Sequence, residues 1–147
     1  MGTRCVIRLM QFGRSVDLYH HWDGYPEGVG LKLRDEIRHW FEGRPADLEM
    51  DAGELATYLV KNAKDGKDGS RYPATKNDDD GFVVTVFQHW DAEYLYELDF
   101  GMKSGLTKDE MLQRLKCYKL KMHLGGDYAG YDKQDDINLA EVEEERS

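Results

Sequence analysis

The hydrophobic pattern changes its period across "YHHWDGYPEGVGLKL", residues 19–33, and this change limits the possible folds more than any other feature. Before it, residues 4–21 contain two short apolar runs separated by a turn at Gly13, which predicts a β-hairpin. After it, apolar residues recur at helical spacing over residues 28–42: Val29, Leu33, Ile37, Trp40 and Phe41. The chain must therefore pass from a strand to a helix through a tight, glycine-rich turn.

A second helix and a second hairpin are predicted downstream. Asp51 and Glu54 resemble a capping box in front of an apolar helical face that reaches Leu59. The polar stretch 61–80 follows as a long loop. Two apolar runs, "FVVTVFQHW" from Phe82 and then "YLYELDF", predict a second hairpin.

A third helix is predicted to start at the capping box of Thr107 and Glu110. Its core edge would contain Met111, Leu115 and Tyr118 or Lys119. The element order is then ββαα–ββα. It predicts an α+β fold in which an antiparallel sheet of two hairpins carries helices packed on one face.

Charge divides the chain into two parts. Residues 125–147 contain eight acidic and two basic residues, so they carry −6 of the formal net charge of −9. We expect residues 1–124 to form a single α+β domain and residues 125–147 to form an acidic C-terminal extension, for which a solvated terminus is the simplest interpretation. An acidic chain is a poor general nucleic-acid binder, because such proteins use basic surfaces to displace counterions. This charge leaves two kinds of partner open: a basic protein, or a small anion bound at a local positive site.

Composition also indicates the compartment. The chain has no apolar run of the ~20 residues that span a bilayer, so no membrane association is expected. Cys5 and Cys117 are far apart in a chain without a recognisable secretory signal, which predicts reduced thiols in the cytoplasm. Self-association into a homo-oligomer is left open.

The junction is the best candidate for a binding site. The free N–H groups of a first helical turn attract anions, and glycines let a ligand approach the backbone closely. Neighbouring side chains could add charge or stack on a planar ring. The predicted ligand-binding residues are Arg4, His21, Trp22, Asp23, Gly24, Tyr25, Gly28 and Gly30. The alternative is a purely structural turn whose aromatic residues belong to the core.

Metal and catalytic motifs are absent from the sequence. His20 and His21 are adjacent, so on a strand they face opposite sides and cannot share one ion. The triplet "HWD" occurs at residues 21–23 and 89–91, and a site with two histidines and two aspartates would form only if both strand ends met. No metal or cofactor is therefore expected, and no catalytic residue is assigned.

The opening "MGTRCVIRL" and the stretch "YHHWDGYPEGVG" resemble a set of small phage, prophage and microbial proteins that open with MGTR and carry an HWDGYPEGxG motif. The resemblance covers about the first 35 residues, and Cys5 departs from it, since a small residue such as Gly is expected there. It implies that a shared element contains Thr3, Arg4, Asp23, Gly24, Tyr25, Pro26, Gly28 and Gly30. It implies no catalytic role for any of them.

These patterns together favour a non-catalytic, phage-type binding protein. Its ligand would be a small phosphorylated molecule, such as a nucleotide signal, or a host protein, and its role would be to antagonise a host defence. One alternative is a nucleotide-processing enzyme that uses His21 and Asp23 as acid and base. Another is an acidic mimic that binds a nucleic-acid-binding protein through the extension.

Overall fold

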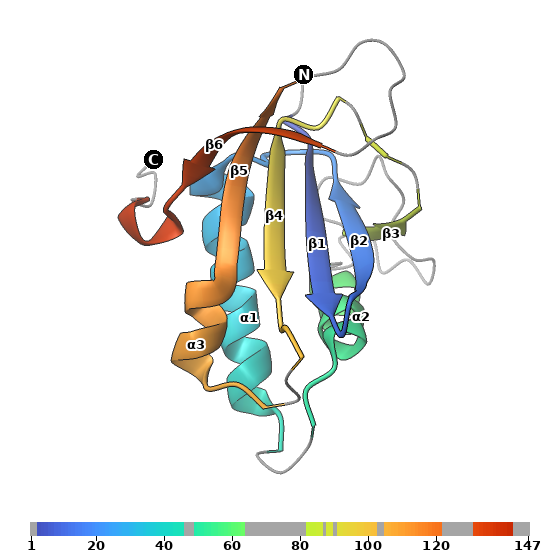
Figure 1. The fold of residues 1–147 in the computed structure, drawn as a ribbon, viewed down its shortest axis with the longest axis vertical. Helices are drawn as coiled ribbons and strands as arrows, with labels where there is room; N and C mark the ends of the chain where they lie inside the picture. Colours follow the sequence, from blue (N-terminus) through green and yellow to red (C-terminus); the bar gives the residue numbers. More distant parts are fainter. Residues whose placement is uncertain are drawn as a thin grey trace.

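The computed structural model describes residues 3–45, 49–63, 82–86, 88–89, 91–102, 105–121 and 131–142. The described residues form one six-stranded sheet and three α-helices (Figure 1). The strands are β1 (Cys5–Gln11), β2 (Arg14–His20), β3 (Val83–Thr85), β4 (Tyr94–Asp99), β5 (Leu115–Lys121) and β6 (Asp132–Ile137). The helices are α1 (Leu31–Gly43), α2 (Ala52–Ala63) and α3 (Lys108–Arg114), with a π-helical turn at Pro26–Gly30 and a 3-10 turn at Leu139–Glu141.

The sheet confirms the α+β class but is mixed. Its strand order is β3-β2-β1-β4-β5-β6, and the central pair β1 and β4 is parallel. The prediction of two antiparallel hairpins is right for β1 and β2 and wrong for the second pair. β3 extends the sheet beside β2, whereas β4 lies between β1 and β5. Parallel neighbours need a long crossover, and here the chain between β1 and β4 includes β2, α1, α2 and β3.

The third predicted helix is shorter than expected. Its capping box is present: Thr107 Oγ1 accepts from the Glu110 N–H at 3.1 Å, and Glu110 Oε1 accepts from the Thr107 N–H at 3.2 Å. The helix ends at Arg114, however, and the chain continues as β5. Leu115 and Cys117 are buried on either side of the exposed Lys116, which is the two-residue period of a strand, and this strand pairs with β4 and β6. The element order is therefore ββααββαββ in the described residues.

Part of the predicted acidic extension lies in the sheet. Residues 132–137 pair with β5 as strand β6, which the sequence analysis did not predict. The following turn buries Leu139, and Ile137 packs against the main core. Residues 133–136 of this edge strand are exposed, and charged side chains at a sheet edge discourage pairing with another chain.

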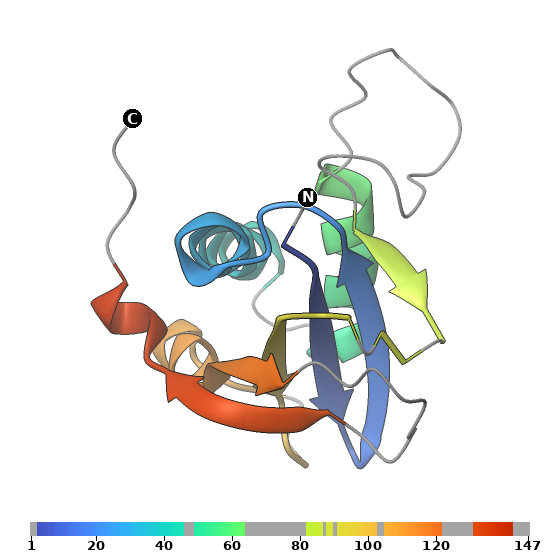
Figure 2. The same ribbon diagram turned by 90° about the horizontal axis from the view of Figure 1, so that it is seen from above.

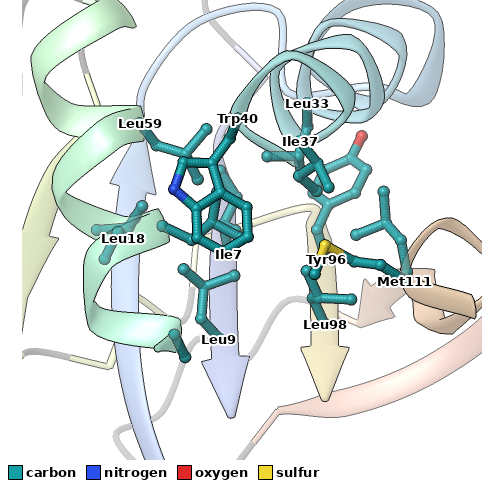
Figure 3. Close-up of a cluster of buried hydrophobic side chains, with 14 of the residues drawn as sticks. Ile7, Leu9, Leu18, Leu33, Ile37, Trp40, Leu59, Tyr96, Leu98 and Met111 are labelled. Atoms are coloured by element: carbon teal, nitrogen blue, oxygen red, sulfur yellow. The ribbon is translucent and has the colours of Figure 1, made fainter. Parts of the chain in front are cut away.

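The helices cover one face of the sheet, as predicted (Figure 2). Successive side chains of β1 point to opposite faces of the sheet. Ile7 lies in the main core with the helices, and Val6 belongs to a smaller apolar cluster on the other face. Figure 3 shows how Trp40, Leu33 and Ile37 of α1 meet the sheet residues. The predicted helices over 28–42 and 51–59 are confirmed as α1 and α2. Most of the predicted loop 61–80 lies outside the described residues.

None of the helices in the described part of the chain is both long and apolar enough to cross a bilayer.

Candidate functional site

The three glycines of the junction are closely approached by the protein itself. A β-carbon on Gly24 would lie 2.8 Å from the β-carbon of Cys5 and from the carbonyl oxygen of Thr3. One on Gly28 would lie 2.5 Å from the carbonyl oxygen of Asp23. One on Gly30 would lie 3.0 Å from Leu139 Cδ2. These glycines permit tight packing of the turn against the sheet, and the space above them is filled by this chain.

The backbone N–H groups of the junction are also engaged within the chain. Gly24 donates to Thr3 at 2.8 Å, Gly28 donates to Tyr25 at 3.0 Å, and Val29 donates to Asp23 at 2.9 Å. The N–H groups that were expected to bind an anion therefore already donate to carbonyl oxygens of the same chain. A ligand at this junction would therefore have to be bound mainly by side chains.

Asp23 and Arg4, both in the predicted site, have different partners. Asp23 is exposed, has a positive φ of 54°, and accepts a hydrogen bond of 3.3 Å from the hydroxyl of Tyr25. Arg4 does not pair with Asp23. Its Nε instead lies 3.3 Å from Asp91 Oδ2, so Arg4 joins the junction to the segment before β4.

The adjacent histidines point to opposite faces, as predicted. His20 is buried, and its ring lies 4.9 Å from the ring of Phe82, a member of the main core. His21 lies beyond the end of β2, where its Nδ1 is 2.8 Å from the hydroxyl oxygen of Tyr19. The ring of Trp22 packs edge-on against that of His21 at 4.9 Å, and its buried Nε1 has no hydrogen-bond partner in the described residues.

Tyr19 connects the two copies of the HWD triplet. Its hydroxyl bonds His21 of the first copy, and its ring stacks on that of His89 of the second at 4.0 Å and 24°. Asp91 of the second copy binds Arg4. We call the set of Arg4, Tyr19, His21, His89 and Asp91 the tyrosine–histidine cluster. It lies on the face of the sheet opposite the helices, because Tyr19 belongs to the smaller apolar cluster there.

His89 is fixed from two further sides. Its Nε2 lies 2.8 Å from the hydroxyl oxygen of Thr85, and its backbone N–H donates to the hydroxyl of Tyr131 at 2.9 Å. The contact to Thr85 helps to hold the imidazole ring stacked on that of Tyr19, at an angle of 24°. The half-exposed ring of His21 is less constrained, since its Nε2 has no hydrogen bond to any described residue.

Burial controls the ionisation of the central tyrosine. Desolvation raises the pKa of Tyr19, the carboxylate of Asp91 raises it further, and the guanidinium of Arg4 opposes the shift. The phenol is therefore protonated at neutral pH and acts as a hydrogen-bonding group. The half-exposed Arg4 and the unengaged nitrogen of His21 are the groups that can contact an oxyanion.

A metal site is not formed by the described residues, since they include no group of three or more His, Cys, Asp or Glu side chains placed around one ion. Cys5 and Cys117 are both buried as free thiols. The two HWD triplets do approach one another, but through the ring of Tyr19.

Tyr19, His89 and Asp91 are not among the predicted ligand-binding residues; the second HWD triplet was expected to matter only for a metal site. The signal that could have identified them is the repeated HWD triplet at two predicted strand ends. The triplet follows β2 in one copy and β3 in the other. The two copies meet because β3 pairs with β2, and this strand order is not visible in the sequence.

Comparison with known proteins produced no match to a protein-family model, a curated protein or a solved structure. The chemistry of the tyrosine–histidine cluster must therefore be inferred from its own side chains.

Proposed function

We propose that the protein is a non-catalytic binding protein for a small phosphorylated molecule, with the tyrosine–histidine cluster as its binding site. The observation that carries the proposal is the convergence of two HWD triplets on Tyr19, outside the helix-covered core. A fold that needed only stability would bury apolar residues at this position, because each buried polar group must find a partner.

The chemistry of the site favours an anion with an attached ring. Arg4 pairs with Asp91 and also hydrogen-bonds the hydroxyl of Tyr19, so a partly exposed guanidinium is held in place at the cluster and can bind phosphate oxygens. His21 offers a second nitrogen close by, and the half-exposed ring of Tyr25 lies in the same turn. A nucleotide combines these requirements, since base–aromatic stacking contributes about 1–3 kcal/mol per base.

The resemblance of the first residues to phage and prophage proteins suggests the biological setting of the proposal. Sequestering a nucleotide signal would antagonise a host defence without any chemical step. This role requires tight binding and release of an unchanged ligand.

The hydrogen bond between Tyr19 and His21 favours an enzyme as a second candidate, because a phenol–imidazole pair can transfer a proton. The two functions can be distinguished by the nucleotide that is recovered from the protein. A sequestering protein returns the nucleotide intact after denaturation, and an enzyme returns a product.

The test is a titration of wild-type protein with mono-, di- and cyclic nucleotides by calorimetry, repeated with Arg4→Gln and His21→Gln. Arg38→Gln is the matched control, because Arg38 is also a partly exposed, ion-paired arginine but lies on α1. We expect Arg4→Gln to weaken binding about tenfold, that is by about 1.4 kcal/mol, and the control to bind as the wild type does. If all variants bind equally, the site lies elsewhere; if no nucleotide binds the wild type, the proposal fails.

A further inference from the structure

The turn between β1 and β2 places an aromatic residue in an unfavourable backbone conformation. Phe12 and Gly13 both have positive φ, 53° and 74°, as in a type I′ hairpin turn. Asparagine followed by glycine suits this turn best, because a bulky side chain at positive φ is sterically strained. The N–H of Phe12 donates to the carbonyl of Gly101 at 2.9 Å, and this bond helps to hold the strained residue in place.

The side chain of Phe12 gains little from the fold in return. It is 49% exposed, and Met102, beside the turn residue that Phe12 contacts, is 76% exposed. Exposed apolar side chains that border a groove mark interaction surfaces. Backbone strain that packing does not explain is likewise concentrated at functional sites.

A cavity of about 820 Å³ opens beside Phe12, between the hairpin and the start of α2. Its wall contains the apolar residues Leu9, Val16 and Met50. We call it the hairpin-tip groove. Leu9 and Met50 are almost completely buried, so the apolar surface that a partner can reach belongs mainly to Phe12 and the partly exposed Val16, among polar lining residues. This mixed lining fits an amphipathic protein segment better than a hydrated ion.

The rim of the groove is acidic. Glu49, Asp51 and Glu54 line it and are exposed, against one lining cation, Arg14. Glu54 lies 3.8 Å from Arg44, and Asp51 accepts the N–H of Gly53 at 2.7 Å, so both carboxylates are only partly engaged. The structure describes no ion pair for Glu49.

We propose that the hairpin-tip groove docks a protein partner through a basic segment. An apolar side chain of that segment packs against Phe12 and the partly exposed Val16, and a neighbouring lysine or arginine lies among the rim carboxylates. Aromatic anchors beside charged rims supply most of the affinity in such interfaces. Complementary charge also speeds association with the correct partner.

Charge argues for a foreign partner over a second copy of this chain. A twofold contact through this surface would bring the same acidic rim onto itself, in a chain of net charge −9. Like charges at an interface oppose binding. The groove also lies away from the tyrosine–histidine cluster, so the two surfaces can be tested separately.

The decisive variant is Phe12→Asn, which installs the preferred Asn-Gly turn. We expect it to raise the melting temperature by a few degrees and to weaken partner binding, so stability and binding change in opposite directions. Val86→Thr is the matched control, because Val86 is 93% exposed but lies after β3, away from the groove. Glu49→Gln with Glu54→Gln tests the rim.

The probe is a short synthetic peptide of alternating lysine and leucine, titrated into labelled protein and followed by NMR. We expect shifts centred on Leu9, Val16 and Met50, and binding about tenfold weaker in Phe12→Asn and in the rim variant but unchanged in Val86→Thr. A peptide of alternating lysine and serine should bind much more weakly.

Several results would overturn the proposal. They are equal binding of both peptides, shifts centred on β3 or β6, unchanged affinity in Phe12→Asn, or no shift at millimolar peptide. Sedimentation of the free protein tests the remaining occupant: a dimer that dissociates on Phe12→Asn would show that the groove binds a second copy, against the proposal.

Discussion

The hydroxyl of Tyr96 donates a hydrogen bond of 2.7 Å to the carbonyl oxygen of Gly24. Tyr96 is fully buried on β4, at the centre of the sheet, and Gly24 lies in the strand-to-helix junction. The ring of Tyr96 also lies 3.3 Å from the position that a β-carbon on Gly30 would take. One side chain of the core therefore fixes both ends of the glycine-rich turn.

Replacing Tyr96 by Phe should destabilise the protein by about 1–3 kcal/mol, because it leaves the buried carbonyl of Gly24 without its donor. Urea unfolding measures the change. Tyr25→Phe is the control, since its hydroxyl makes a longer, exposed bond of 3.3 Å to Asp23, and a change below about 0.5 kcal/mol is expected. Equal effects of the two variants would show that the bond to Gly24 does not hold the junction.

The junction glycines predict a second pair of variants. Gly28→Ala places a β-carbon 2.5 Å from a backbone oxygen, which cannot move aside as a flexible side chain could, and we expect a loss of about 1–3 kcal/mol. Gly43→Ala, at the end of α1, meets nothing within 4 Å and should leave stability unchanged or raise it. Thermal melts of both variants measure these changes in stability. A tolerated Gly28→Ala would mean that the turn is open and free to admit a ligand.

Local patterns predicted the local elements well. The hairpin over 4–21, the helical faces after Gly28 and Asp51, and the capping box at Thr107 all depend on neighbouring residues, and each is present. Pairing between distant strands carries no such signal. Local patterns therefore predict a hairpin between β3 and β4, although β4 lies parallel to β1.

The candidate site shows the same limit. The sequence drew attention to the junction, and Arg4 and His21 do lie at the tyrosine–histidine cluster. The junction glycines that follow His21 serve the packing of the turn, which depends on Leu139 and Tyr96 from remote parts of the chain. Tyr19 reads as an ordinary strand residue until the two HWD triplets are brought together.

Alkaline pH should destabilise the fold through its buried thiols. Burial raises the pKa of Cys117 from 9.0 to about 12 and raises that of Cys5 as well. Above about pH 9 the unfolded chain loses these protons while the folded chain keeps them, so the free energy of unfolding falls as pH rises. Each thiol contributes a slope of up to about 1.4 kcal/mol per pH unit.

Urea unfolding at pH values from about 8 to 10.5 tests this expectation. Cys117→Ala should lessen the slope, while Cys5 and the raised pKa of Tyr96 maintain part of it. Thiol reagents should label native protein slowly for the same reason. A flat pH profile together with fast labelling would show that the thiols are accessible in the folded state.

The C-terminal segment yields the last prediction. The sequence alone suggests that deleting residues 127–147 has a small effect, because their composition cannot build a core. The structure gives a different expectation, since Leu139 is only 5% exposed and packs over Gly30, and its carbonyl accepts from Arg34 at 2.9 Å. Leu139→Ala should lower the free energy of unfolding by about 2–3 kcal/mol. Glu141→Ala, an exposed change in the same turn, should alter the free energy of unfolding by less than about 0.5 kcal/mol.

Two deletions test the same segment. Deleting residues 143–147 leaves every described contact in place, whereas deletion from residue 131 should abolish cooperative melting. If both deletions melted like the full chain, β6 would contribute nothing to stability and the extension would be separable after all.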